Sequence, residues 1–274
     1  YTLSLPDALP ICQPGDFSLE VKVTYLFNGE PPMEQTYTVS AHSRLTIDVN
    51  ALVGAGKEVS IMCQADYPFV SERPMYFNYT GGGGQWTGGH DAVGASLPAT
   101  TWYFAEGYTG PGFDEWICVL NPGDDEAELT FRFQTQEEGE KRIGGLSVPP
   151  NSRRSFKAND LLGGSFQTSL TLEATSPVVA ERSEYFSYQG TNAWNWTGGH
   201  CVMGATSLAD HYYFAEGTTR TEFEQWITVQ NPNPRPITVK ATYQLASGDP
   251  ITKEYNIDAA RRYTIYVPYE VGIN

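Results

Sequence analysis

A set of acidic, basic and imidazole side chains recurs in this sequence at matching positions. Together such groups could bind a metal ion or a ligand, or they could neutralise one another inside a fold. The repeated letters are an E-R dipeptide, the E of the motif F-A-E-G and the H of the motif W-T-G-G-H. The set consists of Glu72, Arg73, His90, Glu106, Glu181, Arg182, His200 and Glu216.

We expect this set to form a buried structural network rather than a reaction centre. An Arg and a Glu that recur among apolar residues are typical of a hydrogen-bonded pair, and removing one partner of a buried pair costs about 3–5 kcal/mol. The glycines of W-T-G-G-H are expected to allow a tight turn, which the Trp and the His fix against the body of the domain. The alternative is that each set forms a ligand or metal site, one in each repeat.

The sequence offers little for metal binding or catalysis. A metal site needs several converging His, Cys or carboxylate ligands, whereas each repeat supplies one recurring His. No C-x-x-C, G-x-S-x-G or H-E-x-x-H motif occurs. We therefore predict no catalytic residue, no cofactor and no metal ion. A fragment of a secreted hydrolase stays as an alternative, because paired carboxylates can form a glycosidase site.

Three tryptophans suggest a different chemistry, the stacking of an aromatic ring on a sugar. Trp86, Trp194 and Trp196 lie in stretches rich in Gly and Asn. An exposed ring beside amide groups could bind a carbohydrate, so these residues are candidate carbohydrate contacts. We favour the other interpretation, in which the rings cover the end of a domain.

The stretches that position these residues repeat along the chain. The two copies of W-T-G-G-H start 110 residues apart, at Trp86 and Trp196, and FDEWICVLNP at 113–122 returns as FEQWITVQNP at 223–232. Short alternating runs such as LTFRFQ predict strands with one buried face. Clusters of Gly, Pro and Asn predict turns, and only NALVGAG and NDLLGG could form a short helical turn. Trp116 and Trp226 are expected in the core.

This pattern predicts an all-β fold of tandem immunoglobulin-like antiparallel β-sandwich repeats of about 110 residues, because about seven short strands fit that length. We name the predicted domains the N-terminal segment (12–98), the middle segment (99–208) and the C-terminal segment (209–274). The middle segment holds a complete repeat, and the other two are expected to be truncated. Residues 1–11 resemble a translated sequencing adapter and are set aside as an artefact.

Composition excludes two classes of partner. The chain has 17 basic and 32 acidic residues and a net charge of −15, which repels phosphate backbones and anionic lipids. No apolar run approaches the roughly 20 residues of a spanning helix. We therefore predict neither nucleic-acid binding nor membrane insertion.

The motifs F-A-E-G, F-x-x-W-I-x-V-x-N-P, V-x-E-R-x-x-Y-F and W-T-G-G-H together resemble a family of tandem β-sandwich repeats with no established function. The resemblance covers residues 12–274. It implies a bacterial protein that is secreted or attached to the cell wall, with neighbouring repeats and other domains of the full chain as partners. We expect a non-catalytic spacer, stalk or adhesion module. The alternative is a module that binds carbohydrate or cell-wall polysaccharide through the loop tryptophans.

Overall fold

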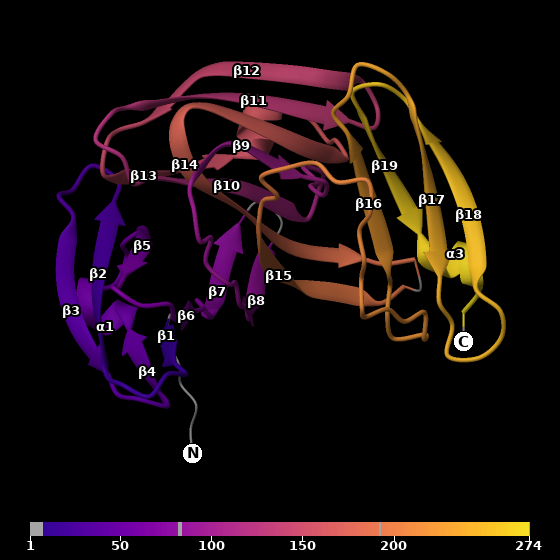
Figure 1. The fold of residues 1–274 in the computed structure, drawn as a ribbon. Helices are drawn as coiled ribbons and strands as arrows, with labels where there is room; N and C mark the ends of the chain where they lie inside the picture. Colours follow the sequence, from indigo (N-terminus) through magenta and orange to yellow (C-terminus); the bar gives the residue numbers. More distant parts are fainter. Residues whose placement is uncertain (1–7, 82–83, 192, 274) are drawn as a thin grey trace.

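The computed structural model describes residues 8–81, 84–191 and 193–273. These residues form an all-β fold of 19 strands and three helices of five residues each. Figure 1 shows an arch, with β1 to β6 at one end, β11, β12 and the first part of β14 across the top, and β16 to β19 at the other end; β7, β8 and β15 lie below the middle. None of the helices in the described ranges is long and apolar enough to cross a membrane.

The N-terminal strands form two sheets of three strands and a separate hairpin. The sheets have the orders β4-β1-β6 and β3-β2-β5, and β7 pairs with β8. A buried cluster that includes Val21, Val23 and Tyr25 lies between the two sheets. The elements are β1 (Ala8–Gln13), β2 (Leu19–Phe27), β3 (Met33–Val39), β4 (Ser43–Asp48), α1 (Val49–Val53), β5 (Val59–Gln64), β6 (Val70–Ser71), β7 (Met75–Gly81) and β8 (Gly84–His90).

The middle strands form one sheet around an unusually long strand. That strand, β14, has 22 residues; it pairs with β11 and β9 over its first half and with β10 and β15 over its second half. The remaining strands β12 and β13 flank β11 and β10. The elements are β9 (Ala99–Phe104), β10 (Phe113–Asn121), β11 (Ala127–Thr135), β12 (Gly139–Val148), β13 (Ser152–Lys157), α2 (Ala158–Leu162), β14 (Thr168–Gln189) and β15 (Asn195–Met203).

The alternation of apolar and polar residues explains the core of the middle segment. Leu129, Phe131 and Phe133 of β11 are buried on one face, while Arg132 lies on the other face and pairs with Glu140. The buried rings of Phe131 and Phe133 belong to the main hydrophobic cluster of this segment. The prediction of half-buried strands from this run is confirmed.

The C-terminal strands form two separate pairs, β16-β19 and β17-β18. Tyr213 and Phe214, from the second copy of the F-A-E-G stretch, are exposed and lie outside any strand, whereas their counterparts Tyr103 and Phe104 lie in β9. The elements are β16 (Trp226–Asn231), β17 (Ile237–Tyr243), β18 (Ile251–Ile257), β19 (Arg261–Tyr266) and α3 (Val267–Val271).

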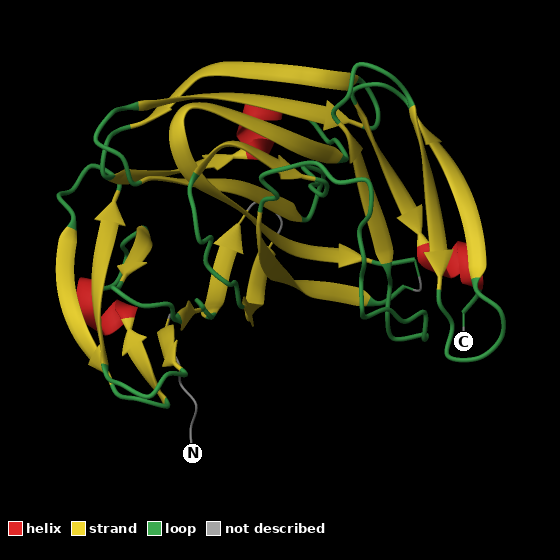
Figure 2. Cartoon of the chain, viewed as in Figure 1, coloured by secondary structure: helices red, strands yellow, loops and turns green. Residues whose placement is uncertain are grey.

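The short helices expected in two stretches are confirmed, a third helix was not expected, and the two tryptophans expected in the core lie outside it. The two stretches expected to form a helical turn overlap α1 and α2, each of which starts one residue before its stretch. The third helix, α3, lies in a stretch where no helical turn was expected, and each helix follows the end of a strand (Figure 2). Trp116 is half-buried and lies outside the hydrophobic core, and Trp226 is 43% exposed, so neither is a core residue. The two tryptophans differ in exposure because β10 pairs on both sides, with β13 and β14, whereas within the described ranges β16 pairs only with β19.

The segment boundaries stay a prediction. Of the stretch attributed to an adapter, residues 1–7 lie outside the described residues, and 8–11 form the first part of β1. Leu9 and Ile11 are buried there, and β1 pairs with β4 and β6.

Candidate functional site

A row of ionisable side chains crosses the sheet at the second half of β14. In the strand register, Glu115 of β10 stands opposite Glu184 of β14, and Glu184 stands opposite His200 of β15. Residues that stand opposite one another in antiparallel strands share a face, and so do residues two apart in one strand. Arg182 therefore lies on the same face as these three groups.

Arg182 is the centre of this cluster and is almost completely buried. Its Nη1 donates a hydrogen bond to Glu184, and its Nη2 lies 2.8 Å from Oε2 of Glu106. The same Nη2 lies 3.5 Å from Nδ1 of His200, whose Nε2 is 3.6 Å from Oε2 of Glu106. Three of the recurring residues, Glu106, Arg182 and His200, thus meet at one point.

A second guanidinium reaches this cluster from the C-terminal segment. Arg262 of β19 is buried, and its Nη1 donates a hydrogen bond of 2.6 Å to the carbonyl oxygen of Gly107. Glu115 is fully buried beside them and accepts a hydrogen bond of 3.1 Å from the hydroxyl of Thr168. The cluster therefore contains three carboxyl groups and two guanidinium groups.

Burial and charge act against each other on these carboxyl groups. Burial raises the pKa of Glu184 well above its ordinary value and raises the pKa of Glu115 to about 7, although Arg182 opposes both shifts. Burial also acts to raise the pKa of Glu106, but the charges of Arg182 and His200 outweigh it and hold that pKa below its ordinary value. Burial lowers the pKa of His200. With a neutral imidazole, three carboxyl groups and two guanidinium groups balance in charge when one carboxyl group is protonated.

The positions of Glu106, Glu184 and His200 could suit a metal ion, because their ligand atoms all lie within 4.8 Å of one another. However, Arg182 contacts all three side chains. Its guanidinium already supplies the positive charge that these carboxylates need in a buried site. The arrangement therefore fits a structural ion-pair network better than a cation site.

A separate contact lies on the opposite face of β14. Nη1 of Arg73 is 2.6 Å from Oε2 of Glu181, and its Nη2 is 3.3 Å from Sγ of the buried Cys201. Because neighbouring residues of a strand point to opposite faces, Glu181 and Arg182 serve different contacts. Arg73 therefore connects the hairpin end of the N-terminal segment to the middle segment.

Five of the eight predicted residues do not join the Arg182 cluster. Arg73 and Glu181 pair separately, and Glu72, His90 and Glu216 belong to neither contact. Glu216 is exposed, and neither Glu216 nor Glu72 makes a side-chain hydrogen bond or ion pair within the described part of the chain. Both ring nitrogens of His90 are buried without a partner among the described residues, and burial lowers its pKa to about 4. The His90 ring instead lies beside the rings of Phe77 and Tyr185, at 6.0 and 6.3 Å between ring centres. The expected buried network is therefore wrong for Glu72, His90 and Glu216, and its remaining residues form two separate contacts rather than one.

The prediction that the glycines of W-T-G-G-H lie in a tight turn is wrong. They lie in the strands β8 and β15. A Cβ atom at Gly89 would lie 2.7 Å from Cδ1 of Tyr76, and one at Gly199 would lie 2.7 Å from Cδ1 of Tyr185. Real Cβ atoms are not found so close to another heavy atom, so both positions require glycine. The motif repeats because a tyrosine ring on the neighbouring strand lies directly over it.

The three tryptophans differ in exposure. Trp86 is fully buried and stacks on Tyr79 at 5.2 Å, so its ring faces are not available to a ligand. Trp196 is half-buried, with its Nε1 enclosed. Trp194 is 52% exposed and is the candidate that could touch a carbohydrate.

A pair of matching contacts was missed by sequence reasoning. The hydroxyl of Tyr79 donates a hydrogen bond of 2.8 Å to Oδ2 of Asp114, and the hydroxyl of Tyr188 donates one of 3.3 Å to Oε2 of Glu224. Each contact connects one segment to the next. The signal was present in the sequence, because Asp114 and Glu224 occupy the same place in the two F-x-x-W-I stretches.

No family model matches this chain. No curated protein matches it either. Among solved structures, the Thermotoga maritima protein 1070 is similar over 40% of this chain and 96% of its own, with 22% identity and a TM-score of 0.35. The Anabaena sensory rhodopsin transducer is similar over 32% of this chain and 91% of its own, with 25% identity and a TM-score of 0.27. Similarities at these scores support no conclusion about fold or function.

The chemistry of the charged cluster is that of a packed interior. A general acid or base must reach the proton that it transfers, whereas Glu115 and Glu184 are enclosed by protein. Glu106 and His200 are partly exposed but are bound to Arg182. The arrangement is suited to holding strands of two segments together.

Proposed function

We propose that this protein is a non-catalytic structural module, a spacer or stalk of tandem immunoglobulin-like β-sandwiches in a bacterial surface or secreted protein. The observation that supports this proposal is that one pair of the recurring set, Arg73–Glu181, and two matching tyrosine–carboxylate hydrogen bonds connect the segments. A spacer needs such contacts, because domains joined by a linker alone move relative to one another. The surface or secreted location rests on the family resemblance.

Two sets of contacts carry the argument. The N-terminal and middle segments are connected by the Arg73–Glu181 ion pair and the Tyr79–Asp114 hydrogen bond. A third contact packs the ring of Phe77 against that of Tyr185, with 4.9 Å between their centres. These groups are half-buried or buried, so water competes with them less than on an open surface.

The second set connects the middle and C-terminal segments. Arg262 donates to Gly107, and Tyr188 donates to Glu224. Thr264 also donates a hydrogen bond of 2.8 Å to the side-chain oxygen of Gln167. Both connections between segments therefore use side-chain hydrogen bonds close to a hairpin, β7-β8 in the first connection and β14-β15 in the second. These contacts favour a stalk of limited flexibility.

Small-angle X-ray scattering on the full chain tests this proposal. We expect one rigid arch to account for the wild-type curve. The triple variant Arg73→Ala, Tyr79→Phe, Tyr188→Phe should give a larger radius of gyration with unchanged far-ultraviolet circular dichroism. Tyr213→Phe is the matched control, because this side chain is 89% exposed. A wild-type curve that requires freely moving segments would refute the spacer.

One observation favours a second candidate, a module that binds cell-wall polysaccharide. The exposed ring of Trp194 lies at the end of a loop in which the N–H of Gly190 donates a hydrogen bond of 2.8 Å to the Trp194 carbonyl oxygen. A pull-down on purified cell walls with wild type and Trp194→Ala tests this candidate. Retention that does not change in the variant rules out a contact through this ring.

A further inference from the structure

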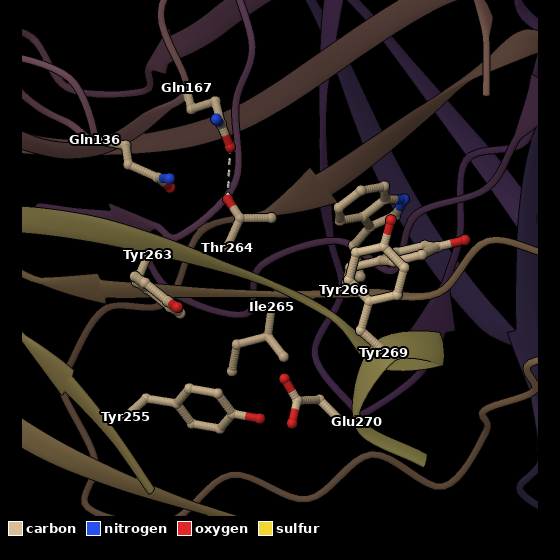
Figure 3. Close-up of a pocket in the computed structure, with 10 residues that line it drawn as sticks. Gln136, Gln167, Tyr255, Tyr263, Thr264, Ile265, Tyr266, Tyr269 and Glu270 are labelled. Carbon is tan, nitrogen blue, oxygen red and sulfur yellow. Dashed lines mark hydrogen bonds between the residues drawn. The ribbon is translucent and has the colours of Figure 1, made fainter. Parts of the chain in front are cut away.

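An aromatic cavity lies between the C-terminal strands and two loops of the middle segment. Its volume is about 330 Å³, at the lower end of the range of small-molecule sites. It is lined by Gln136, Gln167, Trp226, Tyr255, Tyr263, Thr264, Ile265, Tyr266, Tyr269 and Glu270. Figure 3 shows the amides of Gln136 and Gln167 on one side of the cavity and Tyr266 and Tyr269 on another.

Three rings of this cavity are exposed, while Tyr266 is buried against two of its neighbours. Trp226 and Tyr266 lie 4.3 Å apart between ring centres, and Tyr269 lies against Tyr266 at 4.7 Å. Tyr269 is 80% exposed, and Trp226 and Tyr263 are also exposed. Aromatic rings with a free face are suited to stacking on a flat, partly apolar ligand.

The cavity also contains a polar atom without a hydrogen-bond partner in the described ranges. Oε1 of Gln136 is buried and has no donor among the described residues. A buried acceptor without a donor is unfavourable, so a hydroxyl group of a ligand would be stabilised there. Figure 3 shows the carboxylate of Glu270 directed toward the hydroxyl end of Tyr255. The nearest cation to Glu270 is Lys253, whose Nζ is 3.9 Å away.

We propose that this cavity binds a neutral saccharide. A pyranose ring presents a C–H face, which the tyrosine and tryptophan rings can cover, and hydroxyl groups, which Gln136 and Glu270 can bind. A purely apolar ligand would leave the polar groups of the cavity unpaired. An acidic sugar would be repelled by Glu270 and by the net charge of −15. The site goes beyond the spacer role and does not depend on it.

This cavity is a different site from the candidate carbohydrate contacts of the loop tryptophans. Trp86, Trp194 and Trp196 do not line it. The loop of Trp194 touches one wall, because Thr191 Oγ1 lies 2.8 Å from the hydroxyl of Tyr266. Variants of Trp194 and Tyr269 therefore separate the two possible carbohydrate contacts.

Isothermal titration calorimetry on the full chain tests the proposal with cellohexaose, xylohexaose, chitohexaose and, as the acidic probe, hexagalacturonate. We expect saturable binding of at least one of the three neutral hexasaccharides and none of hexagalacturonate. Tyr269→Ala should weaken that binding at least tenfold, and Gln136→Leu should weaken it as well. Tyr213→Ala and Trp194→Ala should leave it unchanged.

Thermal unfolding of each variant shows that it is folded, and Tyr269→Ala is expected to unfold at the wild-type temperature because the ring is mostly exposed. The proposal is overturned if none of the three neutral hexasaccharides binds at millimolar concentration. It is also overturned if Tyr269→Ala binds as tightly as wild type, or if hexagalacturonate binds as well as the neutral probes. None of these results bears on the scattering test of the spacer.

Discussion

Arg73 donates a hydrogen bond to Glu181, and these two residues come from different copies of the same E-R dipeptide. The dipeptide therefore does not pair with itself within one copy. Arg182, the arginine of the second copy, lies on the other face of β14 and binds Glu106 and Glu184. The same two letters thus contribute to two different contacts, one on each face of the strand.

Replacing Arg182 by Ala should destabilise the fold severely. The side chain is buried against Glu106 and Glu184, and its removal leaves carboxyl groups without a counter-charge. We expect the free energy of unfolding in urea to fall by about 3–5 kcal/mol. Arg142→Ala is the control, because its side chain is exposed, and it should change the value by less than about 0.5 kcal/mol. Equal effects of the two substitutions would disprove a buried role for Arg182.

The raised pKa of Glu115 should appear as a pH-dependent loss of stability. The unfolded chain releases this proton near the ordinary value of 4.5, whereas the folded chain keeps it up to about pH 7. Between these values the folded state binds more protons, so the free energy of unfolding decreases as pH rises and the contribution is constant above pH 7. The full effect is at most about 3 kcal/mol.

Glu115→Gln isolates this effect, and glutamine suits the position because Gln225 stands at the matching place in the C-terminal segment. We expect the stability of the variant, relative to wild type, to increase between pH 5 and pH 8 in urea titrations. A difference between variant and wild type that stays constant over this range would show that Glu115 is ionised throughout.

Trp86 and Trp194 were both candidate carbohydrate contacts, but replacing each by alanine should change the free energy of unfolding by different amounts. Trp86→Ala removes a fully buried ring and should cost about 3–5 kcal/mol of unfolding free energy. Trp194→Ala removes a largely exposed ring and should change stability by less than about 0.5 kcal/mol. Guanidinium unfolding followed by circular dichroism measures both values. A small effect at Trp86 would mean that its ring is accessible in solution.

The C-terminal segment should open more readily than the middle segment. Its strands form pairs rather than a wider sheet, and Trp226 of β16 is exposed. Hairpins without further strands are only marginally stable. We expect amide hydrogens of β16 and β17 to exchange at least tenfold faster than those of β10 and β11. Equal protection in the two regions would contradict this expectation.

Strand positions could be predicted from the sequence because they depend on local alternation. Leu129, Phe131 and Phe133 are buried as their spacing indicates, and α1 and α2 lie where short turns of helix were expected. These features need only neighbouring residues in the chain. The all-β class follows from the same local pattern.

The candidate site was less predictable, because burial there depends on partners from distant strands. Glu216 matches Glu106 in sequence but is exposed, since no strand forms around its copy of F-A-E-G. Glu115 and Glu184 were missed because their matching positions hold other residue types, such as Gln225. Repetition identified Arg182 and His200, and only the strand register shows which carboxyl groups they meet.

A double-mutant cycle on Arg73 and Glu181 tests most directly whether the recurring polar residues connect successive segments. The free energy of unfolding is measured for wild type, Arg73→Ala, Glu181→Ala and the double variant. We predict that the double variant loses at least about 1 kcal/mol less than the sum of the two single losses, as for residues in contact. Losses that add to within about 0.3 kcal/mol would show that the two copies of the dipeptide are not coupled, and would contradict this account.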